Sequence, residues 1–263
     1  MLRYFKKIKK NKKMILDLAK NDFKTKYSGS YFGILWGIIQ PIVSILVFWF
    51  VFEVGFRAKV DNNTPFVVWI TAGLVPWFFF SEGLGNMTYS FIEYSYLVKK
   101  VMFDIEILPL IKLMSAFFIH CIFLILLLSL LIIHKIPISI YYIQIIYYSF
   151  ATFMFTLSIG LFTSCIVPFF RDFGQIVQIF LQFGVWLSPI MWQISIIPKR
   201  YLGIFKLNPM YYIVEGFRNS IFYNIGFWNY PLQTIYFWFT VILLLKISFI
   251  IYRKLSPYFS DVI

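Results

Sequence analysis

The amino-acid sequence predicts an all-α integral membrane protein with six transmembrane helices. Of the 263 residues, 60% are hydrophobic and only 13% are charged, and the mean hydropathy is +0.79. About a quarter of the residues of a typical soluble domain are charged, so this chain has too few charges to cover a water-exposed surface. The apolar residues also form long runs, and a bilayer core of about 30 Å needs about 20 such residues per helix.

Six apolar runs are long enough to cross a bilayer, and charged residues, prolines or asparagines interrupt the chain between them. In chain order the predicted spans cover residues 34–56, 66–91, 105–133, 140–170, 173–197 and 230–252. They form a transmembrane domain over residues 34–252. A basic segment over 1–33 precedes it and a short tail over 253–263 follows it.

Positive charge predicts the orientation of these spans. Ten of the 24 Lys and Arg residues lie between Arg3 and Lys26. With the N-terminus inside the cell, about 17 cations fall on cytoplasmic segments and about seven on external ones, as the positive-inside rule requires. We therefore expect both termini in the cytoplasm and the protein in the cytoplasmic membrane. A nucleic-acid partner is not expected, because the basic run leads into apolar spans without a stacking motif.

Residues 14–27 have apolar side chains on one helical face and lysines beside it. This pattern predicts an interfacial amphipathic helix that lies along the inner leaflet, in contact with membrane lipids. Anchoring is the simpler interpretation. A second interpretation is that the other face of this helix also receives a cytoplasmic partner.

The segment over 198–229 is apolar enough for much of its length to suggest a seventh span. Three charged residues argue against that span: Lys206, Glu215 and Arg218. Each would cost about 2.5 to 3.5 kcal/mol at the centre of a membrane helix. Asn208 and Pro209 also break the segment. We therefore expect two short re-entrant helices that dip into the outer leaflet between the fifth and sixth spans.

Motifs for chemistry are missing from the sequence. It contains no G-x-x-x-x-G-K-[ST] phosphate loop, no H-E-x-x-H and no G-x-S-x-G. Cys121 and Cys165 lie in apolar stretches, and the histidines are too few and too isolated for a metal site. Asp104 and Glu106, the nearest acidic pair, are expected on opposite sides of a helix. We expect no catalytic residue, no metal and no cofactor in this chain.

Polar residues inside the spans are more informative, because they are costly against lipid and often mark a pathway. One face of the fifth span carries a stripe at i, i+3, i+7 and i+11: Gln175, Gln178, Gln182 and Trp186. Trp36 and Gln40, one turn apart in the first span, could face the same pathway. Amides and aromatic rings suit the hydroxyls and faces of sugars. The alternative is that the amides form hydrogen bonds between helices.

Two further groups lie within the spans. Glu82, midway along the second span, is a lone intramembrane carboxylate and so a functional candidate. It could instead be protonated or paired with a neighbouring amide. His120 is expected to be a satisfied core residue.

Two cytoplasmic corners, 94–103 and 169–175, combine charged and aromatic residues in a way that suits docking on another protein. The candidate docking residues, including one from the amphipathic helix, are Phe23, Tyr96, Leu97, Lys99, Lys100, Arg171 and Asp172. The alternative is that both corners are solvated turns whose cations set the topology.

Several stretches of the sequence resemble one family. They are GILWGIIQP (33–41), AGLVPWFFFSEGL (72–84), EYSYLVKKVMFDIEILP (93–109), FFRDFGQIVQ (169–178), SPIMW (188–192), LNPMYYIVEGFRNSIF (207–222) and YFSDVI (258–263). Over essentially its full length the chain resembles the ABC-2 type permeases that export lipid-linked polysaccharides. It is most similar to the teichoic acid translocation permeases of Gram-positive bacteria, which are related to O-antigen and capsule exporter permeases.

The resemblance implies a homodimeric pore powered by two copies of a separate ABC ATPase, which would hold ATP and Mg. The corner near Tyr96 would then be a coupling helix seated in the ATPase, with the amphipathic helix and the Arg171 corner beside it. Polymer would pass between the protomers, along the first and fifth spans. The re-entrant helices would narrow the exit, with these gate residues: Asn208, Pro209, Tyr211, Glu215 and Arg218.

The predicted function is therefore a permease subunit that moves an undecaprenyl diphosphate-linked glycopolymer, with teichoic acid as the leading cargo. An O-antigen or capsular polysaccharide is the first alternative. A drug or lipid exporter of the same architecture is the second. The third is a membrane-embedded transferase that acts on a lipid-linked sugar, with Glu82 and His120 as its nearest candidate pair.

Overall fold

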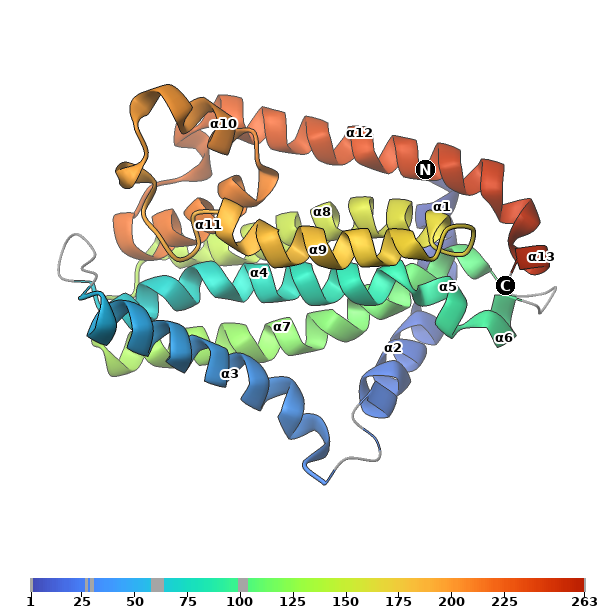
Figure 1. Cartoon of the computed structure of the whole chain (residues 1–263), viewed down its shortest axis with the longest axis horizontal. Helices are drawn as coiled ribbons and strands as arrows, with labels where there is room; N and C mark the ends of the chain where they lie inside the picture. The colour runs from blue at the N-terminus through green and yellow to red at the C-terminus, as the bar shows by residue number, and fades with distance from the viewer. Residues whose placement is uncertain (1, 27, 29–30, 58–63, 99–103, 263) are drawn as a thin grey trace.

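The computed structural model describes residues 2–26, 28, 31–57, 64–98 and 104–262, and within these ranges all regular structure is helical (Figure 1). Among the described residues, five helical segments are long and apolar enough to cross a membrane: Gly33–Gly55, Phe66–Thr88, Ile105–Ile133, Ile140–Ile166 and Pro231–Tyr258. These five correspond to the first four predicted spans and the sixth, with shifts of a few residues at some ends. The all-α fold with several apolar spans is confirmed.

The longer helices are connected by short 3₁₀ and π turns. In chain order the α-helices are α1 (Leu2–Lys10), α2 (Lys12–Lys26), α3 (Trp36–Trp49), α4 (Phe66–Thr88), α5 (Ser90–Glu93), α6 (Ser95–Val98), α7 (Leu108–Ile133), α8 (Gln144–Ile166), α9 (Asp172–Leu187), α10 (Leu202–Lys206), α11 (Pro209–Arg218), α12 (Pro231–Leu255) and α13 (Phe259–Val262). Helices α5, α6 and α13 lie at one end of the bundle, and α10 and α11 lie at the other (Figure 1). The amphipathic segment predicted over 14–27 is helical as α2, and residue 27 lies outside the described ranges.

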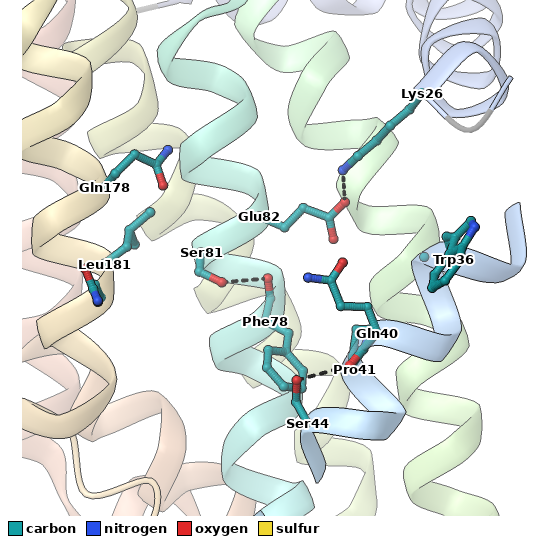
Figure 2. A pocket seen from close by; sticks show the side chains of 12 residues that line it. Lys26, Trp36, Gln40, Pro41, Ser44, Phe78, Ser81, Glu82, Gln178 and Leu181 are labelled. Atoms are coloured by element: carbon teal, nitrogen blue, oxygen red, sulfur yellow. Dashed lines mark hydrogen bonds and ion pairs between the residues drawn. The ribbon is translucent and has the colours of Figure 1, made fainter. Parts of the chain in front are cut away.

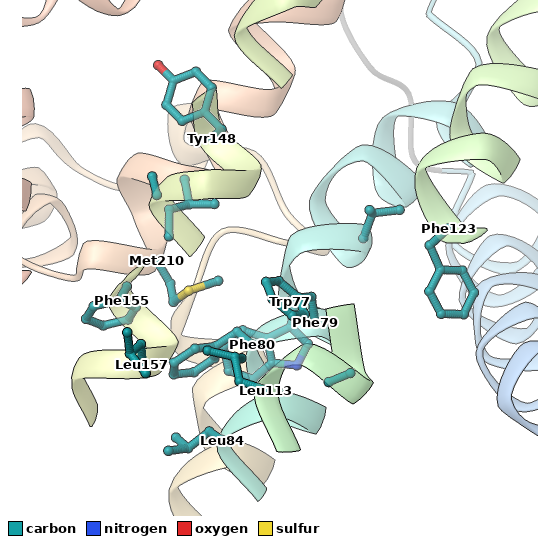
Figure 3. Close-up of a cluster of buried hydrophobic side chains, with 14 of the residues drawn as sticks. Trp77, Phe79, Phe80, Leu84, Leu113, Phe123, Tyr148, Phe155, Leu157 and Met210 are labelled. Atoms are coloured by element: carbon teal, nitrogen blue, oxygen red, sulfur yellow. The ribbon is translucent and has the colours of Figure 1, made fainter. Parts of the chain in front are cut away.

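Helix α4 forms the centre of the bundle, between α7 and α8 (Figure 1). Most of its residues are apolar and buried, and such a helix is stable where other helices cover most of its surface. Ser81 and Glu82, on its less covered side, are only partly buried. The core around it is strongly aromatic (Figure 3). Phe80 stacks on Phe155 of α8 with ring centroids 5.4 Å apart, and Phe79 stacks on His120 of α7 at 4.6 Å. His120 is buried and hydrogen-bonded to Ser149 (3.0 Å), as expected for a core residue.

Helix α3 lies at the periphery and buries little of its surface. Ile45 is its only buried residue, whereas Val43, Leu46 and Val47 are exposed. Apolar surface of this extent is stable against lipid or a second protein surface. A largely apolar helix with one packed side is therefore consistent with its place in a membrane protein.

The fifth predicted span is shorter as a helix than the sequence suggested. Helix α9 ends at Leu187, so the helix predicted over 173–197 is wrong in its last ten residues. Ser188 is extended (φ −95°, ψ 142°) because the residue before a proline is disfavoured in the α region, and Pro189 follows it. The 16 residues of α9 span about 24 Å at 1.5 Å per residue, which is somewhat less than a bilayer core.

The segment over 198–229 contains two short helices, α10 and α11, as predicted. The break between them lies at Asn208, whose side chain accepts a hydrogen bond from the Met210 N–H (3.0 Å), and Pro209 occupies the first turn of α11. The Asn208 amide also donates to Ser188 Oγ (3.0 Å), which joins this break to the end of α9. Whether these helices re-enter a membrane stays a prediction.

Gly216 brings α11 against α8. A Cβ at Gly216 would overlap the Tyr148 ring, whereas a Cβ at Gly203 of α10 would meet no heavy atom within 4 Å. We expect Gly216→Ala to destabilise the fold by about 1–3 kcal/mol, the usual cost of overpacking. Gly203→Ala, the matched control, should leave stability unchanged or slightly higher. Thermal unfolding in detergent measures both, and equal unfolding temperatures would contradict this packing.

Candidate functional site

A polar pocket of about 560 Å³ lies between α2, α3, α4 and α9 (Figure 2). Its polar and aromatic lining residues are Lys26, Trp36, Gln40, Ser44, Phe78, Ser81, Glu82, Gln178 and Gln182. Most of these groups are neutral hydrogen-bonding groups that can both donate and accept, or aromatic rings. This composition suits a polyhydroxylated ligand better than an apolar one.

An ion pair crosses the polar pocket. Lys26 Nζ, at the end of α2, lies 2.6 Å from Glu82 Oε1 of α4, and the two side chains are 37% and 22% exposed. Gln40 of α3 points toward Glu82 from the other side (Figure 2). Glu82 is therefore not a lone carboxylate, and its ionic partner is a lysine of α2 rather than a neighbouring amide. Sequence analysis missed this pair because the two residues are 56 positions apart.

The structure brings together four of the six predicted pathway residues. Trp36 and Gln40 of α3 line the polar pocket with Gln178 and Gln182 of α9. The other two, Gln175 and Trp186, are exposed on α9 but do not line this pocket. Within the part of the chain that the structure describes, no hydrogen bond joins the three α9 amides to another helix.

A buried arginine lies near the other end of the bundle, beside the break after α9. Arg218 of α11 donates to the carbonyls of Pro189 and Ile190 (2.5 and 2.6 Å) and to Glu215 Oε1 (2.9 Å). Its guanidinium also lies 3.5 Å from the ring centroid of Trp69 in α4. A buried charge is costly unless it is paired and hydrogen-bonded, and Arg218 meets both conditions.

Helix α4 leaves room for this arginine at Gly73. A Cβ at Gly73 would lie 2.9 Å from the Arg218 Nη2 atom. The predicted gate residues thus hold α11 in place: Asn208 and Pro209 begin the helix, Tyr211 is buried, and Glu215 pairs with Arg218. A gating role for them stays a prediction.

The predicted docking residues differ in their surroundings. Tyr96 is exposed at α6, Leu97 is half-buried, and Arg171 and Asp172 are exposed at the start of α9. Lys99 and Lys100 lie outside the described residues. Phe23 packs edge-on against Phe118 of α7, with ring centroids 6.0 Å apart, so its ring helps to attach α2 to the bundle.

Ion pairs attach α1 and α2 to the bundle at the α5 end. Lys112 Nζ of α7 lies 2.5 Å from both Asp22 of α2 and Glu93 of α5, and the Tyr94 hydroxyl donates to Asp22 (2.8 Å). We call Asp22, Glu93, Tyr94 and Lys112 the α2 charge cluster. Burial and the Asp22 carboxylate together raise the pKa of Tyr94 above its usual range, so this phenol stays protonated and remains a donor.

Lys7 of α1 makes a second attachment. Its Nζ atom lies 2.8 Å from Asp104 and 3.1 Å from Glu106. The expectation that these two carboxylates point to opposite sides is therefore wrong, because one cation bridges both. The hydrogen bond from Lys7 lowers the pKa of Asp104, although partial burial opposes the shift.

Comparison with known proteins decides the family. A family model described as ABC-2 type transporter matches residues 15–222. The chain belongs to the ABC-2 type transporter family. Two O-antigen export system permease proteins RfbA from Klebsiella pneumoniae are each 26% identical to it over 251 residues, which cover 95% of both chains. A protein of the same name from Myxococcus xanthus is 26% identical over 109 residues, 41% of each chain. With its apolar helices, this ABC-2 chain is a multi-pass membrane transport protein.

Loss of the Arg218 charge should destabilise the ABC-2 chain. We expect Arg218→Gln to lower the free energy of unfolding by about 3–5 kcal/mol, because Glu215 and two backbone carbonyls would lose their buried donor. Arg200→Gln is the matched control, since Arg200 is exposed. Thermal unfolding in detergent tests the difference. Similar losses in both variants would show that Arg218 does not stabilise this end.

The Lys7–Asp104 contact should depend on pH. A carboxyl whose folded-state pKa is lowered stabilises the fold above its unfolded pKa of about 3.9, and that contribution is lost as the pH falls through the folded value. We expect a spin label at the exposed Lys9 position, in a chain whose cysteines are replaced by alanine, to gain mobility below about pH 4. With Asp104→Asn the label should already be mobile at neutral pH. A label with the same mobility in both chains at neutral pH would refute the attachment.

Proposed function

We propose that this ABC-2 chain is the permease subunit of an exporter that moves a lipid-linked glycopolymer across the cytoplasmic membrane. The polar pocket is the observation that carries the proposal, because it joins an indole and three amides from two different helices. Such groups bind sugar hydroxyls and stack on sugar faces without requiring one linkage. The names of the Klebsiella relatives, which describe O-antigen export, support the same class of cargo.

The charge balance of the polar pocket favours a glycan of low charge. The charged residues of its described lining are Lys26 and Glu82, and they neutralise one another. A polymer with a phosphate in every repeat, as in teichoic acid, would be expected to need additional cations along its path. We therefore place an O-antigen or capsular glycan linked to undecaprenyl diphosphate ahead of teichoic acid. Teichoic acid, supported by the sequence motifs, is the second candidate.

We further propose that two copies of an ABC ATPase, which bind ATP and Mg, drive two copies of this chain. Family membership and the lack of a phosphate-binding loop in this sequence support a separate ATPase. Its docking surface would include Tyr96, Leu97, Arg171 and Asp172, with α1 and α2 beside it. This requires the α5 end to be cytoplasmic, which the distribution of cations supports. Helix α9 would then be the fifth of six spans, and α10 and α11 would be re-entrant.

The transferase alternative has little support from the geometry. It would need an ionised carboxylate and a histidine near one water-filled cleft. Glu82 is paired with Lys26 in the polar pocket, whereas His120 is buried against Phe79 and bonded to Ser149. The two groups therefore do not share a site.

The role of the amides that line the polar pocket can be tested by comparison with Gln175, which belongs to the same stripe on α9 but does not line the pocket. We expect Gln178→Leu combined with Gln182→Leu to reduce polymer export about tenfold, since each lost hydrogen bond costs about 0.5–1.5 kcal/mol. Gln175→Leu, the matched control, should change export less than twofold. The measurement is glycan appearing at the surface of cells that rely on this permease and its ATPase. Unchanged export in the double variant would contradict the assignment of the pathway to the pocket, and so would equal losses in the double variant and in Gln175→Leu. Export of a drug-like substrate without polymer would favour the small-molecule alternative.

A further inference from the structure

Near its end, α2 carries two charged residues that bind different parts of the bundle. Asp22 and Lys26 are four positions apart, so they lie one turn apart on the same face of the helix. Asp22 belongs to the α2 charge cluster, near α5 and α6. Lys26 reaches Glu82 of α4 in the polar pocket. One helical turn therefore connects the proposed docking corner with the proposed pathway.

The Asp22 end of this connection is less exposed than the Lys26 end. The side chains of Asp22 and Lys112 are only 9% and 12% exposed, and the Lys112 ammonium also lies 4.9 Å from the centre of the Tyr94 ring. Salt screens buried ion pairs far less than exposed ones. Tyr94 directly precedes α6, and its ring centroid lies 6.2 Å from that of the exposed Tyr96. A displacement of α6 would therefore be transmitted to Asp22 through these short contacts.

The Lys26 end is more accessible. Both members of the Lys26–Glu82 pair are partly exposed, and such pairs contribute little free energy, so they separate readily. Glu82 belongs to α4, whose neighbouring residues Gly83 and Leu84 are buried in the core, so its backbone is held by packing. A movement of α2 would separate Lys26 from Glu82 and change the polar pocket without unpacking α4.

Membrane anchoring alone does not require these contacts. Ile15 and Ala19 are buried and attach α2 through its apolar face, while Lys20 and Lys24 are exposed and suited to anionic lipid. Asp22 and Lys26 instead point to two specific partners within the bundle.

We infer that Asp22 and Lys26 are positioning residues through which movement of the docking corner opens the polar pocket. The inference rests on the proposed function, because it requires an ATPase at α6 and cargo in the pocket. With the Lys26–Glu82 pair formed, the two side chains join α2 to α4 along the lining of the pocket. When the ATPase displaces α6, the α2 charge cluster moves α2, and the pair separates.

The test uses the complete permease–ATPase complex in liposomes and measures the polymer exported per ATP hydrolysed. We expect Lys26→Gln, Glu82→Gln and Asp22→Asn each to lower this ratio about tenfold, and Lys24→Gln, the matched control, to leave it unchanged. The exchanged pair, Lys26→Glu with Glu82→Lys, should restore the ratio to within about threefold of the original. That rescue separates a positioning role from a general loss of folding.

Three results would overturn the inference. Lys26→Gln could behave like Lys24→Gln, the exchanged pair could be as impaired as the single variants, or export and ATP hydrolysis could fall in the same proportion. If the unmodified complex hydrolyses ATP but exports no polymer, the proposed function itself fails, and the inference fails with it. If the unmodified complex exports polymer and the Lys26 variant keeps the same ratio, only the link through α2 is wrong.

Discussion

The arrangement of the α11 end depends on one buried charge, the guanidinium of Arg218. A membrane offers no water to backbone groups, so a chain that leaves its helix there must satisfy its carbonyls within the protein. Helix α9 ends before Pro189, and Arg218 donates to the carbonyls of Pro189 and Ile190. That contact joins α11 to the end of α9. Gly73 of α4 leaves room for the guanidinium. The same arginine stacks on Trp69 and pairs with Glu215. Of its guanidinium nitrogens, Nε alone has no hydrogen-bond partner among the described residues.

The opposite end uses charge differently. Its ion pairs join Lys7 of α1 to Asp104 and Glu106 before α7, and they join α2 to α4 and α7. The Lys26–Glu82 pair in particular is partly exposed. Partly exposed pairs exchange with water at small cost, whereas the Arg218 contacts would leave two buried carbonyls unpaired if they broke. The protein therefore combines one end held by buried contacts with another end at which the ion pair between α2 and α4 is partly exposed.

Local patterns in the sequence predicted the helices well, and distant contacts poorly. The span over 105–133 has the predicted bounds, because a long apolar run needs no knowledge of its neighbours. The end of α9 was missed because Ser188 and Pro189 lie inside an apolar stretch that reads as a continuing span. The Lys26–Glu82 and Lys7–Asp104 pairs left no local signal, since each joins segments far apart in the chain. The charge of Arg218 argues against a seventh span, because a charge is costly in lipid. The protein avoids that cost by burying Arg218 among hydrogen-bond partners.

The exposed face of α9 indicates what must cover this helix when the protein is in a membrane. Helix α3 can face hydrocarbon, because its exposed side chains are largely apolar. The amides of Gln175, Gln178 and Gln182 cannot do so without cost, as an unpaired amide in an apolar medium loses its hydrogen bonds with water. That face of α9 must therefore lie against water, cargo or another protein surface. A second copy of the same chain, related by a two-fold axis, would provide such a surface, because the axis places identical polar faces opposite one another. The stripe on α9 thus supports the proposed pairing of two protomers around a polar path more strongly than the apolar surface of α3 does.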